Sequence, residues 1–152
     1  MLITVPRVLL LTLALLTAVA ASAQDGKLSV SVDHSGNDVV GQRLAFAVRE
    51  AIRSSAGYRL EQPRDALLHL SLITLDPERA PSNTGFWTAA AVSYTMRNGL
   101  PYEKGNPQTW YAINLSTSIV IAGTSRVEEQ AKSILAVLDK QVDEYRKAMQ
   151  PK

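Results

Sequence analysis

The sequence contains no cysteine and only two histidines. No disulfide can stabilise the fold, and a metal site would need His34 or His69 together with carboxylates. His34 follows Asp33 in a segment typical of a turn, whereas His69 lies within an apolar segment typical of a strand. Because no third ligand stands at a recognisable spacing, we expect a turn histidine and a strand histidine, with no metal site and no cofactor.

An excess of charge of one sign is also missing, since 16 Lys and Arg residues are matched by 14 Asp and Glu residues. Proteins that bind nucleic acid usually carry a clear basic excess, so the composition argues against a nucleic-acid partner. The sequence shows neither a glycine-rich phosphate loop nor a nucleophile elbow. We therefore identify no catalytic residue and expect a protein that is not an enzyme.

The first 23 residues predict a secretory signal peptide. Residues 1–7 carry one positive charge, residues 8–20 form an uninterrupted run without charges, and Ala21-Ser22-Ala23 provides the small residues that a signal peptidase reads. The run is shorter than the roughly 20 residues of a membrane span. We expect cleavage before Gln24 and no membrane insertion afterwards. The absence of a cysteine after the run also excludes a lipoprotein anchor.

Residues 24–152 have the length of a single domain. An exported domain without disulfides must be held together by its hydrophobic core. Small eukaryotic secreted domains usually carry disulfides, so the missing cysteines favour a bacterial periplasm as the location.

A long hairpin over residues 85–122 is predicted to organise the sheet. Residues 86–97 and 110–121 each alternate with a period of two, which is typical of strands that have one face in a core and one face in water. In the second half, one face is expected to hold Tyr111, Ile113, Leu115, Thr117, Ile119 and Ile121. Turn-forming residues at 98–101 and 104–107 separate the halves. Three alanines within 88–92 also suit a helix, but the neighbouring β-branched and aromatic residues favour a strand.

The other elements follow from shorter patterns. We expect a strand over 28–33 with its polar face in water, a helix over about 39–55, a short strand over 58–61, and a helix over about 126–148. An apolar strand over 66–75 has leucines on both faces, which predicts a central strand covered at least in part on both sides. The order β-α-β-β-β-β-α predicts a two-layer α/β sandwich (α+β), with a mixed five-stranded sheet and two helices.

Three local signals are expected to mark the helix ends. Asn37 or Asp38 is suited to cap the first helix, because a short side-chain oxygen can accept the first free N–H groups. Gly57 is suited to a left-handed residue after that helix. Ser125 and Glu128 have the spacing of a capping box at the start of the last helix.

The first helix and the strands after it resemble the periplasmic α/β domains of the CsgG and LpoB type and the N-terminal domain of TolB. The resemblance rests on the step from Gly41 to Leu44, on the short strand Gly57-Tyr58-Arg59-Leu60, and on the apolar strand from Ala66 that leads into the hairpin. It implies an assembly or docking module of the cell envelope that is not an enzyme. No catalytic or binding residue carries over from these families.

The aromatic residues of the hairpin suggest where a partner would bind. Trp87 and Trp110 flank the loop ends of the two strands, and Leu100 and Tyr102 lie at the predicted hairpin tip. Tryptophan and tyrosine are favoured as interface anchors, and the alternative for the aromatic residues of the strands is core and cross-strand packing. We expect Leu100, Tyr102, Trp87 and Trp110 to contact an envelope protein or a second copy of the chain. A solvated turn at the tip is the alternative.

A second function remains open from the sequence. Asp76, Glu78 and Glu103 lie in predicted loops near the aromatic residues. Paired carboxylates are the catalytic groups of most glycosidases. The alternative to a docking domain is therefore a small glycan-binding protein or hydrolase that uses these loop acids and exposed aromatic side chains.

Overall fold

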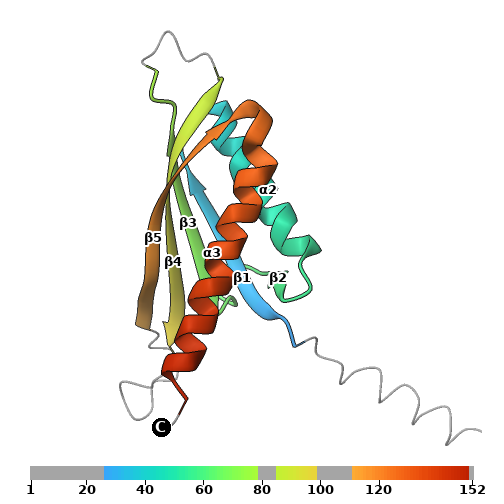
Figure 1. The fold of residues 1–152 in the computed structure, drawn as a ribbon, viewed down its shortest axis with the longest axis vertical. Coiled ribbons are helices and arrows are strands. Elements are labelled where there is room, and N and C mark those ends of the chain that lie inside the picture. Colours follow the sequence, from blue (N-terminus) through green and yellow to red (C-terminus); the bar gives the residue numbers. More distant parts are fainter. Residues whose placement is uncertain (1–25, 79–84, 99–110, 151–152) are drawn as a thin grey trace, which may run out of the picture.

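The computed structural model describes residues 26–78, 85–98 and 111–150. Its elements follow the predicted order (Figure 1). They are β1 (Leu28–Ser35), α2 (Val39–Ser54), β2 (Tyr58–Leu60), β3 (Leu68–Leu75), β4 (Trp87–Asn98), β5 (Tyr111–Gly123), a 3₁₀ turn (Thr124–Arg126) and α3 (Val127–Ala148). The segment 88–92 is part of a strand, as predicted.

The five strands form one mixed sheet in the order β2-β1-β3-β4-β5. β1 is parallel to both β2 and β3, whereas β3, β4 and β5 are antiparallel neighbours. β3 is the central strand, as its leucines predicted. The predicted fold class is therefore confirmed: an α+β two-layer arrangement built on a long β4–β5 hairpin.

Both helices lie on the same face of the sheet (Figure 1). The core lies between the two layers, and its largest fully buried side chains include Tyr94, Leu44, Leu70 and Leu138. On α3, one stripe at helical spacing is buried: Val127, Ala131, Ile134, Leu138 and Val142. The buried hydrophobic residues of both helices thus pack on one side of the sheet.

Asp38 is the residue that caps α2, and its Oδ1 accepts a hydrogen bond from the backbone N–H of Gly41. The left-handed position predicted at Gly57 is wrong. The helix ends instead at Ser54, and Ser55 is extended. The Ser55 Oγ accepts a hydrogen bond from Gly57 N at 3.1 Å, which stabilises the turn after the helix. In the described ranges, only Gly36 and Gly85 have positive φ, at 152° and 64°.

The capping box predicted from Ser125 and Glu128 is also wrong. The chain leaves β5 directly into the 3₁₀ turn that contains Ser125, so this residue does not stand at the extended position that a helix cap requires. Arg126 precedes α3 and makes no side-chain cap. Its guanidinium bonds the Glu129 carboxylate instead, at 2.7 and 2.9 Å.

The alternation predicted for the second half of the hairpin fails at one residue. Tyr94 pairs with Ser116 and Thr95 pairs with Asn114, so Leu115 is an extra residue in β5. Such a bulge reverses which side chains face the core. Leu115 packs against the core, while the later isoleucines of β5 turn to the opposite face.

The polar face predicted to lie in water on β1 is largely buried. Ser31 Oγ lies 2.8 Å from His69 Nδ1, and Ser29 Oγ accepts from Leu67 N at 2.9 Å. Ser29 and Ser31 are thus satisfied by β3 and the residue before it and not by solvent, whereas Asp33 is exposed. His34, predicted as a turn residue, lies within β1.

Candidate functional site

The face of the sheet opposite the helices carries exposed aliphatic side chains in two register-matched rows. One row runs Ile73–Ala91–Ile119 and the next runs Leu75–Ala89–Ile121, each across β3, β4 and β5. We call these six residues the open-face patch. The exposed fractions of its large members are 59% for Ile73, 56% for Leu75, 81% for Ile119 and 62% for Ile121. No helix or strand of the described residues covers them.

The expectation that β3 is covered on both faces is therefore wrong. Leu68, Leu70 and Leu72 are fully buried under the helices, whereas Ile73 and Leu75 on the other face are more than half exposed. Each helix has a single apolar stripe, and both stripes pack on the same face, which leaves the other face of the sheet without a helix.

The local sequence gives the patch its shape. Ala89 and Ala91 are small, so the surface over β4 forms a shallow depression between the larger side chains of β3 and β5. Cross-strand neighbours on one face have Cβ atoms about 5 Å apart, so each row forms a continuous apolar band. Single exposed aliphatic residues are ordinary on protein surfaces, but a contiguous apolar patch marks an interaction site.

Polar residues border the patch along the same face. The next register row is Ser71–Ser93–Thr117, and beyond it His69 pairs with Thr95, whose Oγ1 donates to His69 O at 3.2 Å. At the other end, Trp87 pairs with Gly123 next to the row of Ala89 and Ile121. The patch therefore has a polar border on one side and an indole ring on the other.

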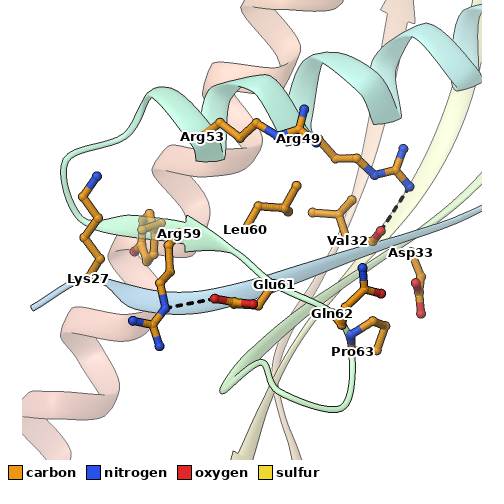
Figure 2. A pocket seen from close by; sticks show the side chains of 11 residues that line it. Lys27, Val32, Asp33, Arg49, Arg53, Arg59, Leu60, Glu61, Gln62 and Pro63 are labelled. Atoms are coloured by element: carbon orange, nitrogen blue, oxygen red, sulfur yellow. Dashed lines mark hydrogen bonds and ion pairs between the residues drawn. The ribbon is translucent and has the colours of Figure 1, made fainter. Parts of the chain in front are cut away.

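A second candidate is a charged hollow of about 600 Å³ beside α2 and β2 (Figure 2). Its basic side chains are Lys27, Arg49, Arg53 and Arg59. Arg49 Nη2 donates to Val32 O at 3.1 Å, and Lys27 Nζ donates to Ser55 O at 3.2 Å. Arg59 pairs with Glu61 at 3.4 Å, and Arg53 pairs with Glu50.

These contacts make the charged hollow the weaker candidate. Figure 2 shows Arg49 directed toward the Val32 carbonyl and Arg59 directed toward Glu61, away from one another. Small-molecule sites are mostly apolar with a few convergent polar groups. Here each cation already has a partner within the chain, so the hollow offers no convergent group for a ligand.

The histidines have structural partners. His34 Nε2 lies 2.8 Å from Thr74 Oγ1, and His69 lies between Ser31 and Asp33, whose Oδ2 is 3.5 Å from Nε2. Burial lowers the pKa of His34, a shift that Asp38 opposes and Arg49 reinforces. Within the described residues no three His, Asp or Glu side chains are grouped as metal ligands.

Two buried tyrosines also have shifted pKa values. Burial raises the pKa of Tyr94, whose hydroxyl lies 3.4 Å from Ser118 Oγ, while that hydrogen bond acts in the opposite direction. Burial and the neighbouring Asp139 carboxylate raise the pKa of Tyr58. Both phenols stay neutral at ordinary pH, which fits residues that pack in the core.

Only one of the four predicted contact residues lies in the described part of the chain. Trp87 lies at the end of the open-face patch, whereas Leu100, Tyr102 and Trp110 lie outside the described residues. Among the predicted loop acids, Asp76 Oδ1 accepts from Glu78 N at 2.8 Å, and Glu103 lies outside the described residues. Residues 1–25, which contain the predicted signal peptide, are also outside.

The open-face patch was missed from the sequence, although its signal is present. Aliphatic residues on both faces of β3 predict that other elements cover the strand on both sides, whereas only one face is covered. The bulge at Leu115 changes which residues of β5 share a face with Ile73 and Leu75 of β3. Simple alternation therefore does not show which isoleucines of β5 face away from the helices.

No family model matches the chain, and no curated protein sequence matches it. Among solved structures, one similar chain is the hypothetical protein CT253 from Chlamydia trachomatis, with 10% identity and a TM-score of 0.36 over 63% of this chain and 72% of that one. Another is a putative neuraminyllactose-binding hemagglutinin homolog from Helicobacter pylori, with 14% identity and a TM-score of 0.27 over 82% and 92%. At these TM-scores neither likeness bears on function.

In the ranges that the structure describes, neither α2 nor α3 has the length and hydrophobicity needed to cross a bilayer.

Proposed function

We propose that this chain is an exported, non-enzymatic domain that docks onto another protein of the cell envelope, in an assembly or accessory role. The observation that supports the proposal is the open-face patch, where two rows of aliphatic side chains are exposed in register on a sheet face that the helices do not cover. An antiparallel sheet with one solvated face normally shows polar residues there.

The chemistry of the patch suits a protein surface more than a small molecule. Its aliphatic side chains form a broad, low area, with Trp87 at one end and the row Ser71–Ser93–Thr117 at the other. Protein interfaces combine an apolar centre with a polar rim, and tryptophan is enriched among the residues that contribute most to binding. The resemblance to CsgG-type and LpoB-type domains agrees with a docking role in the periplasm.

Capture of the partner by the mature chain tests the docking role. We compare native protein with Ile73→Thr/Leu75→Thr, which makes β3 more polar on the open face and places β-branched residues suited to a strand at both positions. Phe46→Gln on α2 is the matched control, because Phe46 is equally exposed on the helix layer. Chemical cross-linking in envelope extract should give a defined adduct with native and control proteins and lose it with the double variant. An adduct of undiminished yield in the folded double variant contradicts the proposed surface.

Export has its own test. If residues 1–23 form a cleaved signal peptide, mass spectrometry of the protein purified from its natural source should show a chain that begins at Gln24. Recovery of intact Met1 in a membrane fraction would contradict periplasmic export.

A further inference from the structure

The outer edge of β5 lacks most of the features that normally protect an edge strand. β5 is the last strand of the sheet and, among the described residues, pairs with β4 alone. Over its 13 residues it contains no charged residue and no proline. Edge strands are usually kept from pairing with other chains by charges, prolines, bulges or short length. The bulge at Leu115 interrupts the strand once, and the pairing from Ser116 to Gly123 is regular.

The opposite edge of the same sheet is protected in the usual way. β2 has only three residues, Tyr58–Leu60, and carries Arg59 at its centre. Glu61, which pairs with Arg59, and Pro63 follow directly. One edge is therefore short and charged, while the other is long and uncharged. The contrast indicates that the β5 edge is kept open for pairing.

The hydrogen-bond pattern shows which backbone groups this edge presents. Thr124 N donates to Phe86 O at 2.9 Å, and these two residues stand opposite each other in the register that pairs Trp87 with Gly123. In an antiparallel ladder, hydrogen-bonded pairs alternate with pairs that are not hydrogen-bonded. Ala122, Val120 and Ser118 therefore bond to β4. By the same alternation, the backbone N–H and C=O groups that point to the outer edge belong to Ile121, Ile119 and Thr117.

We propose that two copies of this chain pair antiparallel through their β5 edges and join their sheets into one. The two-fold axis passes beside Val120, so that Ile119 of each copy stands opposite Ile121 of the other. The row Leu75–Ala89–Ile121 then continues into the row Ile119–Ala91–Ile73 of the second copy. Two open-face patches become one continuous apolar surface. The inference concerns the edge of the sheet, goes beyond docking onto another envelope protein, and does not depend on it.

A second copy is the occupant that this edge fits best. An uncharged strand has no charge pattern that would select a charged strand of another protein, and it meets no repulsion from its own copy. The symmetric register places isoleucine opposite isoleucine and valine opposite valine, which are favourable cross-strand pairs. A two-fold contact also uses each open edge once, so the assembly closes at two chains.

Sedimentation of the mature chain over a range of concentrations tests the pairing. Native protein should reach the mass of two chains. Ile119→Pro removes an N–H that points to the outer edge and costs no bond to β4, so it should weaken dimerisation by roughly tenfold or more. Ile119→Val keeps that N–H and the branched side chain, and should dimerise like the native protein. Ile119→Lys adds a charge to the edge and should be monomeric. This variant tests dimerisation through the β5 edge if the proline variant fails to fold.

Disulfide formation tests the register. The native chain has no cysteine, so a variant carries one thiol only. Val120→Cys stands opposite itself at a pair that is not hydrogen-bonded, where Cα atoms are about 4.5 Å apart, within the range of a disulfide. Oxidation should link two chains of Val120→Cys and leave Ala91→Cys, in the middle of the sheet, unlinked.

Each outcome bears on the inference separately from the docking function. A native protein that stays monomeric at every concentration overturns it, and so does a dimer that is insensitive to both Ile119→Pro and Ile119→Lys. A dimer without a Val120→Cys cross-link overturns the symmetric register. Ile119 also belongs to the open-face patch, so capture of an envelope partner by the monomeric Ile119→Lys variant would show that docking needs neither the dimer nor an aliphatic side chain at this position. Loss of capture by Ile73→Thr/Leu75→Thr, with the dimer intact, would show that the dimer forms independently of docking onto the envelope partner.

Discussion

The two faces of the sheet carry similar amino acids and have opposite surroundings. β3 shows the contrast within one strand, since Leu70 and Leu72 are fully buried while Ile73 and Leu75 are more than half exposed. The difference comes from the helices. α2 and α3 each have one apolar stripe, and both stripes pack on the same face. Hydrophobicity alone therefore does not decide burial in this sheet.

The contrast separates residues that stabilise the fold from residues that do not. A leucine that is fully buried contributes about 1.5–3 kcal/mol to folding through removal of its surface from water. Ile119 is 81% exposed and gains little of this stabilisation. Folding of a single chain therefore does not explain the aliphatic residues of the open-face patch, whereas the proposed contact with a partner would.

The largest expected effect is on the covered face. Leu138 lies in the buried stripe of α3, so Leu138→Ala should lower the free energy of unfolding by about 2–5 kcal/mol in urea denaturation. Leu135 is only partly buried beside the same core, so Leu135→Ala should cost clearly less. Equal losses at the two positions would contradict the placement of the stripe.

The next effect concerns the point where α2 meets β3. A Cβ at Gly41 would overlap the Thr74 hydroxyl and the Asp38 carboxylate. An alanine in a helix normally gains about 0.5–1 kcal/mol over glycine, but here Gly41→Ala should lose about 1–3 kcal/mol because the added methyl has no room.

Thr74→Ala in the Gly41→Ala background provides the control, because it removes one of the two overlapping groups. The double variant should recover part of the loss, measured as a coupling energy in a double-mutant cycle. Stabilisation by Gly41→Ala alone would show that the two elements are less closely packed.

A smaller effect is expected from pH. Burial holds the folded-state pKa of His34 below the 6.5 of the unfolded chain, so the unfolded state binds the proton first as the pH falls. The stability contributed by neutral His34 is complete above about pH 6.5 and is lost as the pH falls from there through the lowered folded-state pKa.

The measurement is the melting temperature between about pH 8 and pH 5. His34→Gln removes the titrating ring and keeps a side chain that can hydrogen-bond to the Thr74 hydroxyl, so its melting temperature should fall less over this range. An identical pH profile for native protein and variant would show that His34 does not account for the dependence.

Much of the fold follows from sequence periodicity, and the exceptions have physical causes. The helix over about residues 126–148 and the central place of β3 were predicted because each rests on a repeated pattern. The capping box at Ser125 failed because a 3₁₀ turn occupies the residues that the motif needs in extended form. The open-face patch was not predicted because it depends on Leu115, a single extra residue that changes the phase of β5. The periodicity of each helix shows that it has one apolar side, but it does not show that both helices pack on the same face of the sheet.

The smallest expected effect is on the open face, and it gives the sharpest test of the comparison. Ile73→Thr keeps a β-branched residue in a strand and should change the free energy of unfolding by less than about 0.5 kcal/mol, as at other exposed positions. Val92→Thr makes the corresponding change on the covered face and buries a hydroxyl, which should cost about 1–3 kcal/mol. Both are measured by urea unfolding of the mature chain at low concentration, where pairing of copies does not contribute. Similar losses at Ile73 and Val92 would mean that the open face is covered within one chain, and the patch would then be unavailable to any partner.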